Sequence, residues 1–243
     1  MNKLLISLTL ALTATFSLSA FAGYKVIDVK DGGSISGTIN FTGKDKAPQI
    51  YKVAKDTDTC GKKDRVIDYV DVKDGKLRNV VVYLSKVKKG KKFDKIEAKI
   101  DQKGCEFMPY MSVMTNGSIF EAKNSDPVLH NIHTYELMGR AKKTVMNVSQ
   151  PKQNSVTKKK VKLKRGAGMK IECDAHDFMH GFVFVAKNPY YAVVADDGSY
   201  TIKDIPAGKY KVKAWHGTLG EKKGKAVVAS GADAKVDFTF KGK

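Results

Sequence analysis

Residues 173–179 read Cys-Asp-Ala-His-Asp-Phe-Met, and this stretch decides how the fold is interpreted. It is followed at residues 182–185 by Phe-Val-Phe-Val, an apolar run typical of a strand buried on both faces. A Cys that leaves one strand and a compact return loop together present Cys173, His176 and Met179 to one metal ion, and the next strand holds that loop in place. The stretch therefore predicts a β-fold with a metal site in the loop between two strands.

A further candidate ligand, His130, lies well upstream in the segment Leu-His-Asn-Ile-His at residues 129–133. One thiolate, two imidazoles and a weak axial thioether form the ligand set of blue copper electron-transfer sites. Asn131 is predicted to bond across the site through its amide and to tie the two ligand segments together. The sequence therefore predicts one type 1 copper ion, and its four expected ligands are His130, Cys173, His176 and Met179.

The first 22 residues have the pattern of a signal peptide. Lys3 supplies a charged start, residues 4–16 an apolar core, and residues 20–22 the small-residue cleavage pattern Ala-Phe-Ala. No later stretch approaches 18 consecutive apolar residues, so no membrane span is expected. The sequence predicts cleavage near Ala22 and a periplasmic or secreted protein.

The chain has three Cys, and an odd number in an oxidising compartment requires an explanation. Cys173 provides one if its thiolate binds metal. Cys60 and Cys105 then remain as the candidate disulfide, a pairing that the sequence alone does not prove.

Strand signals dominate the rest of the chain, and helical periodicity is almost absent. Residues 80–84 (VVVYL) and 182–185 predict strands buried on both faces, whereas alternation at residues 35–41 and 236–240 predicts strands with one buried face. Turn residues such as Asp-Asp-Gly at 196–198 separate these segments. The chain is therefore expected to be all-β.

The chain divides into two kinds of block. Residues 91–187 hold every candidate ligand, whereas residues 23–90 and 188–243 form a Lys-rich framework around them. At this length two compact domains are the natural expectation. We interpret the middle block as a domain inserted into an outer domain, and two successive, independently closed domains are the alternative.

The charge balance is strongly basic, with 44 Lys and Arg against 25 Asp and Glu and a formal net charge of +19. Clusters at residues 86–92 and 158–165 are suited to steering the protein toward an acidic redox protein, such as a c-type cytochrome or a periplasmic dehydrogenase. A solvated, soluble surface is the alternative interpretation. Nucleic acid is not an expected partner, because no binding motif or interleaved aromatic pattern is present.

The segments at residues 129–134 and 173–179 resemble those of the cupredoxins, and especially the amicyanins, which share the Cys-x2-His-x2-Met spacing. The whole chain is similar to exported cupredoxin-containing proteins, some described as methylamine utilisation proteins. Residues 195–212, with the opening strands at 33–39 and 79–84, resemble the carboxypeptidase regulatory-like domain.

These resemblances imply a cupredoxin Greek-key β-sandwich, plastocyanin-like, at residues 91–187. They imply a transthyretin-like or carboxypeptidase regulatory-like β-sandwich at residues 23–90 plus 188–243. They also imply an electron carrier and not an enzyme. Relatives of this kind are expected to carry a His at the position of Tyr110, so an accessory function of that His is in doubt here.

A second hypothesis is a copper carrier or chaperone, because Met108, Met111 and Met114 offer thioethers that suit Cu(I). Packing in the core is the alternative role for these Met side chains. Of the remaining His, the one at 133 is expected to point away from the metal, since an odd strand separation from His130 reverses the face. His180 is expected in a solvent-exposed loop at the rim of the site, and His216 is expected to be structural.

Overall fold

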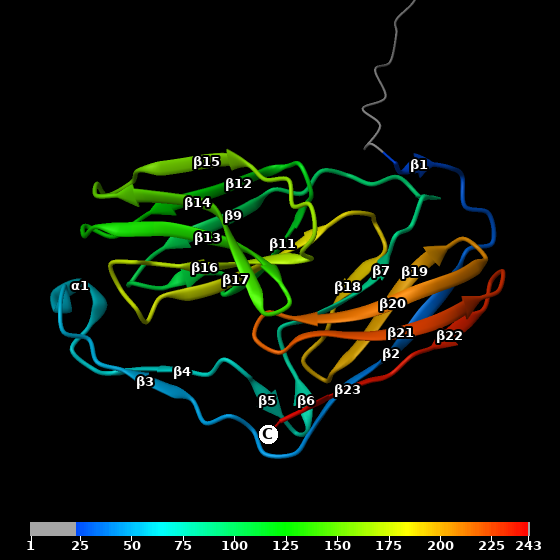
Figure 1. Cartoon of the computed structure of the whole chain (residues 1–243), viewed down its shortest axis with the longest axis horizontal. Helices are drawn as coiled ribbons and strands as arrows, with labels where there is room; N and C mark the ends of the chain where they lie inside the picture. Colours follow the sequence, from blue (N-terminus) through cyan, green and yellow to red (C-terminus); the bar gives the residue numbers. More distant parts are fainter. Residues whose placement is uncertain (1–22, 243) are drawn as a thin grey trace, which may run out of the picture.

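The computed structural model describes residues 23–242, in which the regular elements are strands joined by turns and loops, with one short helix, α1 (Thr57–Cys60). The prediction of an all-β chain is confirmed. The expected signal peptide, residues 1–22, lies outside the described residues. Two β-sandwiches lie side by side (Figure 1). No helix of the described residues is long and apolar enough to cross a membrane.

The sandwich that carries the predicted ligands, called here the metal sandwich, consists of two sheets. The larger sheet has the strand order β11 (Met111–Thr115), β17 (His180–Ala186), β16 (Gly168–Glu172), β13 (His130–Met138) and β14 (Ala141–Gln150). The smaller has the order β10 (Phe107–Met108), β9 (Ala98–Gln102), β12 (Ile119–Asn124) and β15 (Val156–Lys160). Buried side chains from both sheets, such as Phe120 and Ile132, fill the space between them.

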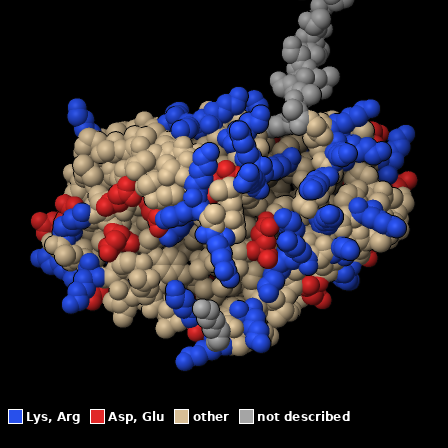
Figure 2. Space-filling view, in the orientation of Figure 1, with Lys and Arg blue, Asp and Glu red and all other residues tan. Residues whose placement is uncertain are grey.

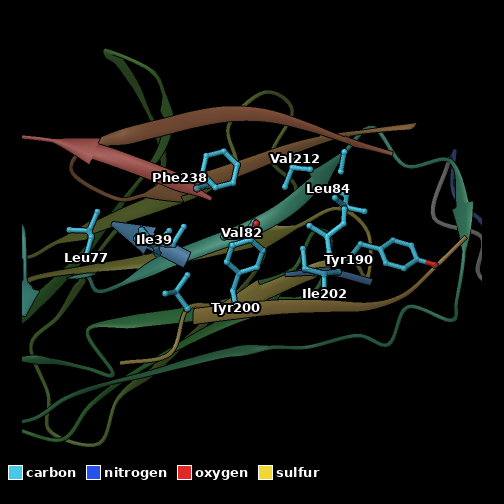
Figure 3. Packing of buried hydrophobic residues seen from close by; sticks show 14 of the residues in the cluster. Ile39, Leu77, Val82, Leu84, Tyr190, Tyr200, Ile202, Val212 and Phe238 are labelled. Carbon is cyan, nitrogen blue, oxygen red and sulfur yellow. The ribbon is translucent and has the colours of Figure 1, made fainter. Parts of the chain in front are cut away.

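The second sandwich, called here the outer sandwich, also has two sheets (Figure 1). One has the order β18 (Tyr191–Val193), β7 (Val80–Ser85), β20 (Gly208–His216) and β21 (Gly220–Val228). The other has β19 (Ser199–Ile205), β2 (Gly33–Thr42), β6 (Lys76–Leu77) and β5 (Val72–Lys73), and two further strands pair in parallel with β2, namely β22 (Asp233–Lys235) and β23 (Phe238–Lys241). Figure 3 shows its core, in which Ile39 and Tyr200 of one sheet pack with Val82 of the other. A short pair, β1 (Lys25–Val26) with β8 (Lys89–Gly90), completes this end.

Two strands are buried on both faces because they separate two cores. Alternate residues of β7 pack into the outer core or toward the metal sandwich, and alternate residues of β17 divide in the same way between the metal core and the interface. At this interface the Phe184 ring lies 5.8 Å from that of Trp215, and a Cβ at Gly168 would lie 2.5 Å from the Trp215 ring. The sequence prediction of strands at residues 80–84 and 182–185 is therefore explained by the packing of one sandwich on the other.

One segment, residues 49–67, crosses from the outer sandwich to the metal sandwich and is called here the strap. It contains β3 (Gln49–Tyr51), α1 and β4 (Arg65–Ile67), and its Cys60 forms a disulfide with Cys105 of the metal sandwich, with an S–S distance of 2.00 Å. The predicted disulfide is confirmed. The structure departs here from the sequence-based division, which placed all of residues 23–90 with the outer sandwich. The division of the chain into domains otherwise stays a prediction.

Candidate metal centre

Three predicted ligands meet in a buried space at one end of the metal sandwich. His130 is the first residue of β13, Cys173 directly follows β16, and His176 lies in the loop that leads to β17. Their ligand atoms lie within 4.8 Å of one another, with the two Nδ1 atoms of the imidazoles 3.2 Å apart and Cys173 Sγ 3.7 Å from His176 Nδ1. All three side chains are buried. The antiparallel pairing of β13 with β16 brings the distant His130 beside Cys173.

Met179, the fourth predicted ligand, closes the same loop. Its backbone N–H donates to the His176 carbonyl at 3.1 Å, and its carbonyl accepts the N–H of Cys173 at 3.4 Å. The side chain is buried in the same cluster as Cys173. The loop is therefore fixed at both of its ends by backbone hydrogen bonds.

Asn131 links the two ligand segments. Its backbone N–H donates to Cys173 Sγ at 3.3 Å, and its side-chain Oδ1 accepts the N–H of Asp174 at 3.3 Å. Burial raises the pKa of the Cys173 thiol, while N–H donors that include Asn131 and His176 oppose this shift by stabilising the thiolate. A metal cation bound beside Cys173 would stabilise the thiolate further, and the thiolate is the form that binds metal.

A carboxylate lies behind each imidazole. Asp126 Oδ2 is 2.8 Å from His130 Nε2, and Asp56 Oδ2 is 2.9 Å from His176 Nε2. Asp126 also accepts the backbone N–H groups of Gly104 and Cys105; although burial disfavours its charge, these bonds and His130 lower its pKa. Burial lowers the pKa of His176, which favours its neutral form.

The donor set fits a metal ion. A carboxylate at each Nε2 favours the tautomer with hydrogen on that nitrogen, which leaves each Nδ1 with a free lone pair. In that tautomer the Nδ1 atoms of His130 and His176 face each other as two acceptors, 3.2 Å apart and beside a sulfur. Such an arrangement is repulsive unless a cation or a proton lies between the acceptors.

Neither carboxylate was among the residues predicted from sequence. Asp126 is four residues from His130 at the start of the same segment, so its position could have suggested the contact. Asp56 is 120 residues from His176 and belongs to the strap, and no pattern in the sequence connects the two. Asp56 has a positive φ of 50° directly before α1, a conformation that Asp adopts more readily than most residues.

The other candidate His side chains have different surroundings. His133 bonds to Asp174 and lies partly exposed on the opposite face of β13, as predicted from its separation. The expectation of an exposed His180 is wrong: its side chain is 8% exposed and packs against the rings of Tyr51, in the strap, and Tyr69, which follows the strap. His216 is buried and its Nδ1 accepts two backbone N–H groups of its own turn, consistent with a structural role.

The three Met side chains do not converge on one point. Met108 is exposed, Met111 packs at the interface between the sandwiches, and Met114 is buried in the core of the metal sandwich. These three separate environments do not provide a shared thioether site, and only Met111 and Met114 pack in the interior. The Tyr110 hydroxyl is buried, and the Tyr110 ring packs against the ring of Phe182.

The chain is distantly similar to solved copper proteins. No protein-family model and no curated protein matches the chain. A copper-containing nitrite reductase from Thermus scotoductus matches 40% of this chain at 14% identity and a TM-score of 0.31, and the match spans only 24% of the reductase. A purple cupredoxin from Nitrosopumilus maritimus matches over 37% of this chain and 99% of its own, at 18% identity and a TM-score of 0.31. Amicyanin from Paracoccus versutus matches over 39% of this chain and 85% of its own, at 14% identity and a TM-score of 0.29.

Proposed function

We propose that the protein binds one type 1 copper ion and carries single electrons between redox proteins. The ligands are His130, Cys173, His176 and Met179. The observation that carries this proposal is the convergence of two imidazole Nδ1 atoms and one thiol in a buried space, with a carboxylate behind each imidazole.

The protein's own contribution is to hold these side chains still. Bound copper supplies a one-electron couple between Cu(I) and Cu(II). The loop hydrogen bonds, the Asn131 link and the two carboxylates fix the ligand positions, and a fixed geometry limits rearrangement when the charge at the centre changes. Burial of both imidazoles, with the strap residue Asp56 against His176, excludes water from the same space.

An electron carrier is a better fit than an enzyme. A copper enzyme that acts on a small molecule keeps an open coordination position. Here four protein side chains are available to one ion, and His130, Cys173 and His176 are each no more than 3% exposed. We therefore expect electrons, and not a substrate, to reach this centre.

The proposed partner is an acidic redox protein, such as a c-type cytochrome or a periplasmic dehydrogenase. The two proteins would meet after export of this chain. The support is charge: Lys and Arg side chains are spread over both sandwiches and across their junction (Figure 2). We expect the association rate with an acidic c-type cytochrome to fall as salt is raised from about 0.01 M to 0.15 M, because the screening length shortens about fourfold. A salt-independent rate would remove the charge argument.

The visible spectrum tests the proposal directly. Purified protein without residues 1–22 is given one equivalent of Cu(II) and then ascorbate. An intense thiolate-to-copper band that is bleached by ascorbate and restored by an oxidant is the expected result. Weak bands only, or uptake restricted to Cu(I), would overturn the electron carrier in favour of copper carriage. That second candidate is favoured by one observation, the presence of two more sulfur atoms beside His176.

A further inference from the structure

The Cys60–Cys105 disulfide lies against the metal centre. Both sulfur atoms and a ring nitrogen of His176 lie within 4.8 Å of one another, and all three residues are buried. The two Cys therefore do more than connect the strap to the metal sandwich. They are placed where, as free thiols, they could reach the same space as a predicted copper ligand.

The surrounding contacts would keep the two thiols together after the bond between them is broken. Arg65 donates one hydrogen bond to the carbonyl of Cys60 at 2.7 Å and another to that of Gly104 at 2.6 Å, and it forms an ion pair with Glu106. The backbone N–H of Cys105 is held by Asp126. The Cα atoms of the two Cys are 5.1 Å apart. These bonds do not depend on the disulfide, so the geometry is prepared for a dithiol.

We propose that reduction of the Cys60–Cys105 disulfide creates a second metal site, in which the thiolates of Cys60 and Cys105 bind Cu(I) together with His176. The reductant is a dithiol. It transfers two electrons and two protons, its own sulfur atoms become a disulfide, and the two Cys become thiols. The thiols lose their protons when the metal binds. Soft thiolate ligands select Cu(I).

The two sites compete because they share His176. In the oxidised chain this imidazole serves the centre with Cys173, and in the reduced chain it is available to Cys60 and Cys105. Reduction of the disulfide would thus convert a centre that holds copper for electron transfer into a site that holds Cu(I) at Cys60 and Cys105, beside the strap. This inference rests on the proposed function for the meaning of the conversion, but the second site is testable without it.

The test uses the full chain with Cys173→Ala, which removes the predicted thiolate of the first centre and leaves the disulfide unchanged. The protein is reduced with a phosphine, desalted without oxygen, and its thiols are counted with Ellman's reagent. It is then loaded with Cu(I) alone and titrated with a Cu(I)-specific chelator. The matched control is the same chain with Cys60→Ser and Cys105→Ser.

We expect reduced Cys173→Ala to hold one Cu(I) against at least about tenfold more chelator than its oxidised form. X-ray absorption should report two sulfur ligands and at least one nitrogen. The control should show no difference between the two treatments. Equal stripping of the reduced and oxidised forms, or equal retention by the control, would overturn the proposal.

Wild-type protein provides a second arm if the variant does not fold, as checked by circular dichroism. Reduced wild type loaded with one equivalent of Cu(I) should show two short Cu–thiolate bonds by X-ray absorption where oxidised wild type shows one, and alkylation of the reduced Cys before loading should abolish the increase. An unchanged number of short Cu–thiolate bonds would overturn the second site. The blue band of the oxidised wild type is a separate measurement, and its absence would overturn the proposed function. The second site would still be decided by the chelator titration and the X-ray absorption data.

Discussion

Both sandwiches bury His side chains, but the ring nitrogens of these side chains have different hydrogen-bond partners. In the outer sandwich, His216 accepts backbone N–H groups from Thr218 and Leu219 at its Nδ1, so the turn that carries it also satisfies it. In the metal sandwich, His130 and His176 are held at Nε2 by carboxylates, and their Nδ1 atoms face each other. Burial alone therefore does not identify a metal ligand. The informative feature is a pair of acceptors aimed at one point.

The same contrast extends to the polar residues around these side chains. The metal sandwich contains a buried chain of hydrogen bonds in which Gln102 donates to Gln150, Asn124 donates to the Gln150 carbonyl and accepts from the N–H of Asp126, and Asp126 contacts His130. The cluster of the outer sandwich drawn in Figure 3 is hydrophobic, and its side-chain polar atoms are Tyr hydroxyls; the separate buried polar side chains of this sandwich, such as Asn188 and His216, bond to nearby backbone groups. A buried polar network is costly where a member is left unsatisfied, as Gln102 Oε1 is, and this network ends at a predicted ligand.

The largest expected effect comes from Cys173→Ala, which removes the only thiol expected in the first centre. Without a thiolate there is no thiolate-to-copper charge transfer, so the intense visible band should be lost entirely. His216→Asn, at the buried His of the outer sandwich, is the matched control and should keep the band. A copper spectrum unchanged by Cys173→Ala would show that the centre lies elsewhere.

A second pair of variants tests whether the sandwiches act separately. Phe120 lies in the core cluster that contains Cys173 and Met179, and Phe240 lies in the outer core; both are fully buried. Each change to Ala should lower the free energy of unfolding by about 3–5 kcal/mol. Chemical denaturation measures that loss, and copper spectra taken under native conditions should change for Phe120→Ala alone. Equal spectral loss in Phe240→Ala would mean that the interface couples the two cores.

Sequence reasoning reached properties that are local. The alternation of the strands and the Cys-x2-His-x2-Met spacing of the proposed ligands are read from residues close together, whereas the Cys60–Cys105 pairing was only a candidate until the structure confirmed it. Sequence reasoning failed at contacts made by the strap. The burial of His180 and the carboxylate of Asp56 depend on where a segment far away in the chain comes to lie, and exposed apolar residues such as Ile50 and Val66 give no signal of that position.

The third prediction concerns pH and the outer sandwich. Burial lowers the pKa of His216 from its ordinary 6.5 to about 4. Between these values the unfolded chain binds a proton that the folded chain does not, so stability is greatest above pH 6.5 and falls as the pH decreases toward 4. The loss attributable to this residue should be roughly 3 kcal/mol. Denaturation of the copper-free protein at pH 7 and pH 4.5 measures it.

His216→Asn supplies the control for that prediction, because the Asn carbonyl replaces the Nδ1 acceptor and does not titrate. The variant should lose part of the difference in stability between the two pH values, whatever its stability at pH 7. His180, whose pKa burial also lowers to about 4, should account for a further part. A pH dependence identical to that of the parent would show that His216 is not held neutral by burial.

The smallest expected effects come from replacing the carboxylates behind the imidazoles. These variants compare the part of the metal centre that the metal sandwich supplies with the part that the strap supplies. Asp126→Asn and Asp56→Asn keep the shape of each side chain but weaken the orientation of one ligand, and each should reduce copper affinity by about 10–100-fold. Asp126→Asn should have the larger effect, since Asp126 is buried and also binds Gly104 and Cys105, whereas the Asp56 side chain is 39% exposed to screening by water. Competition with a copper chelator measures both. If Asp56→Asn proves as damaging as Asp126→Asn, the strap is part of the metal centre as fully as the strands are; if it has no effect, the strap only covers a centre that the metal sandwich builds by itself.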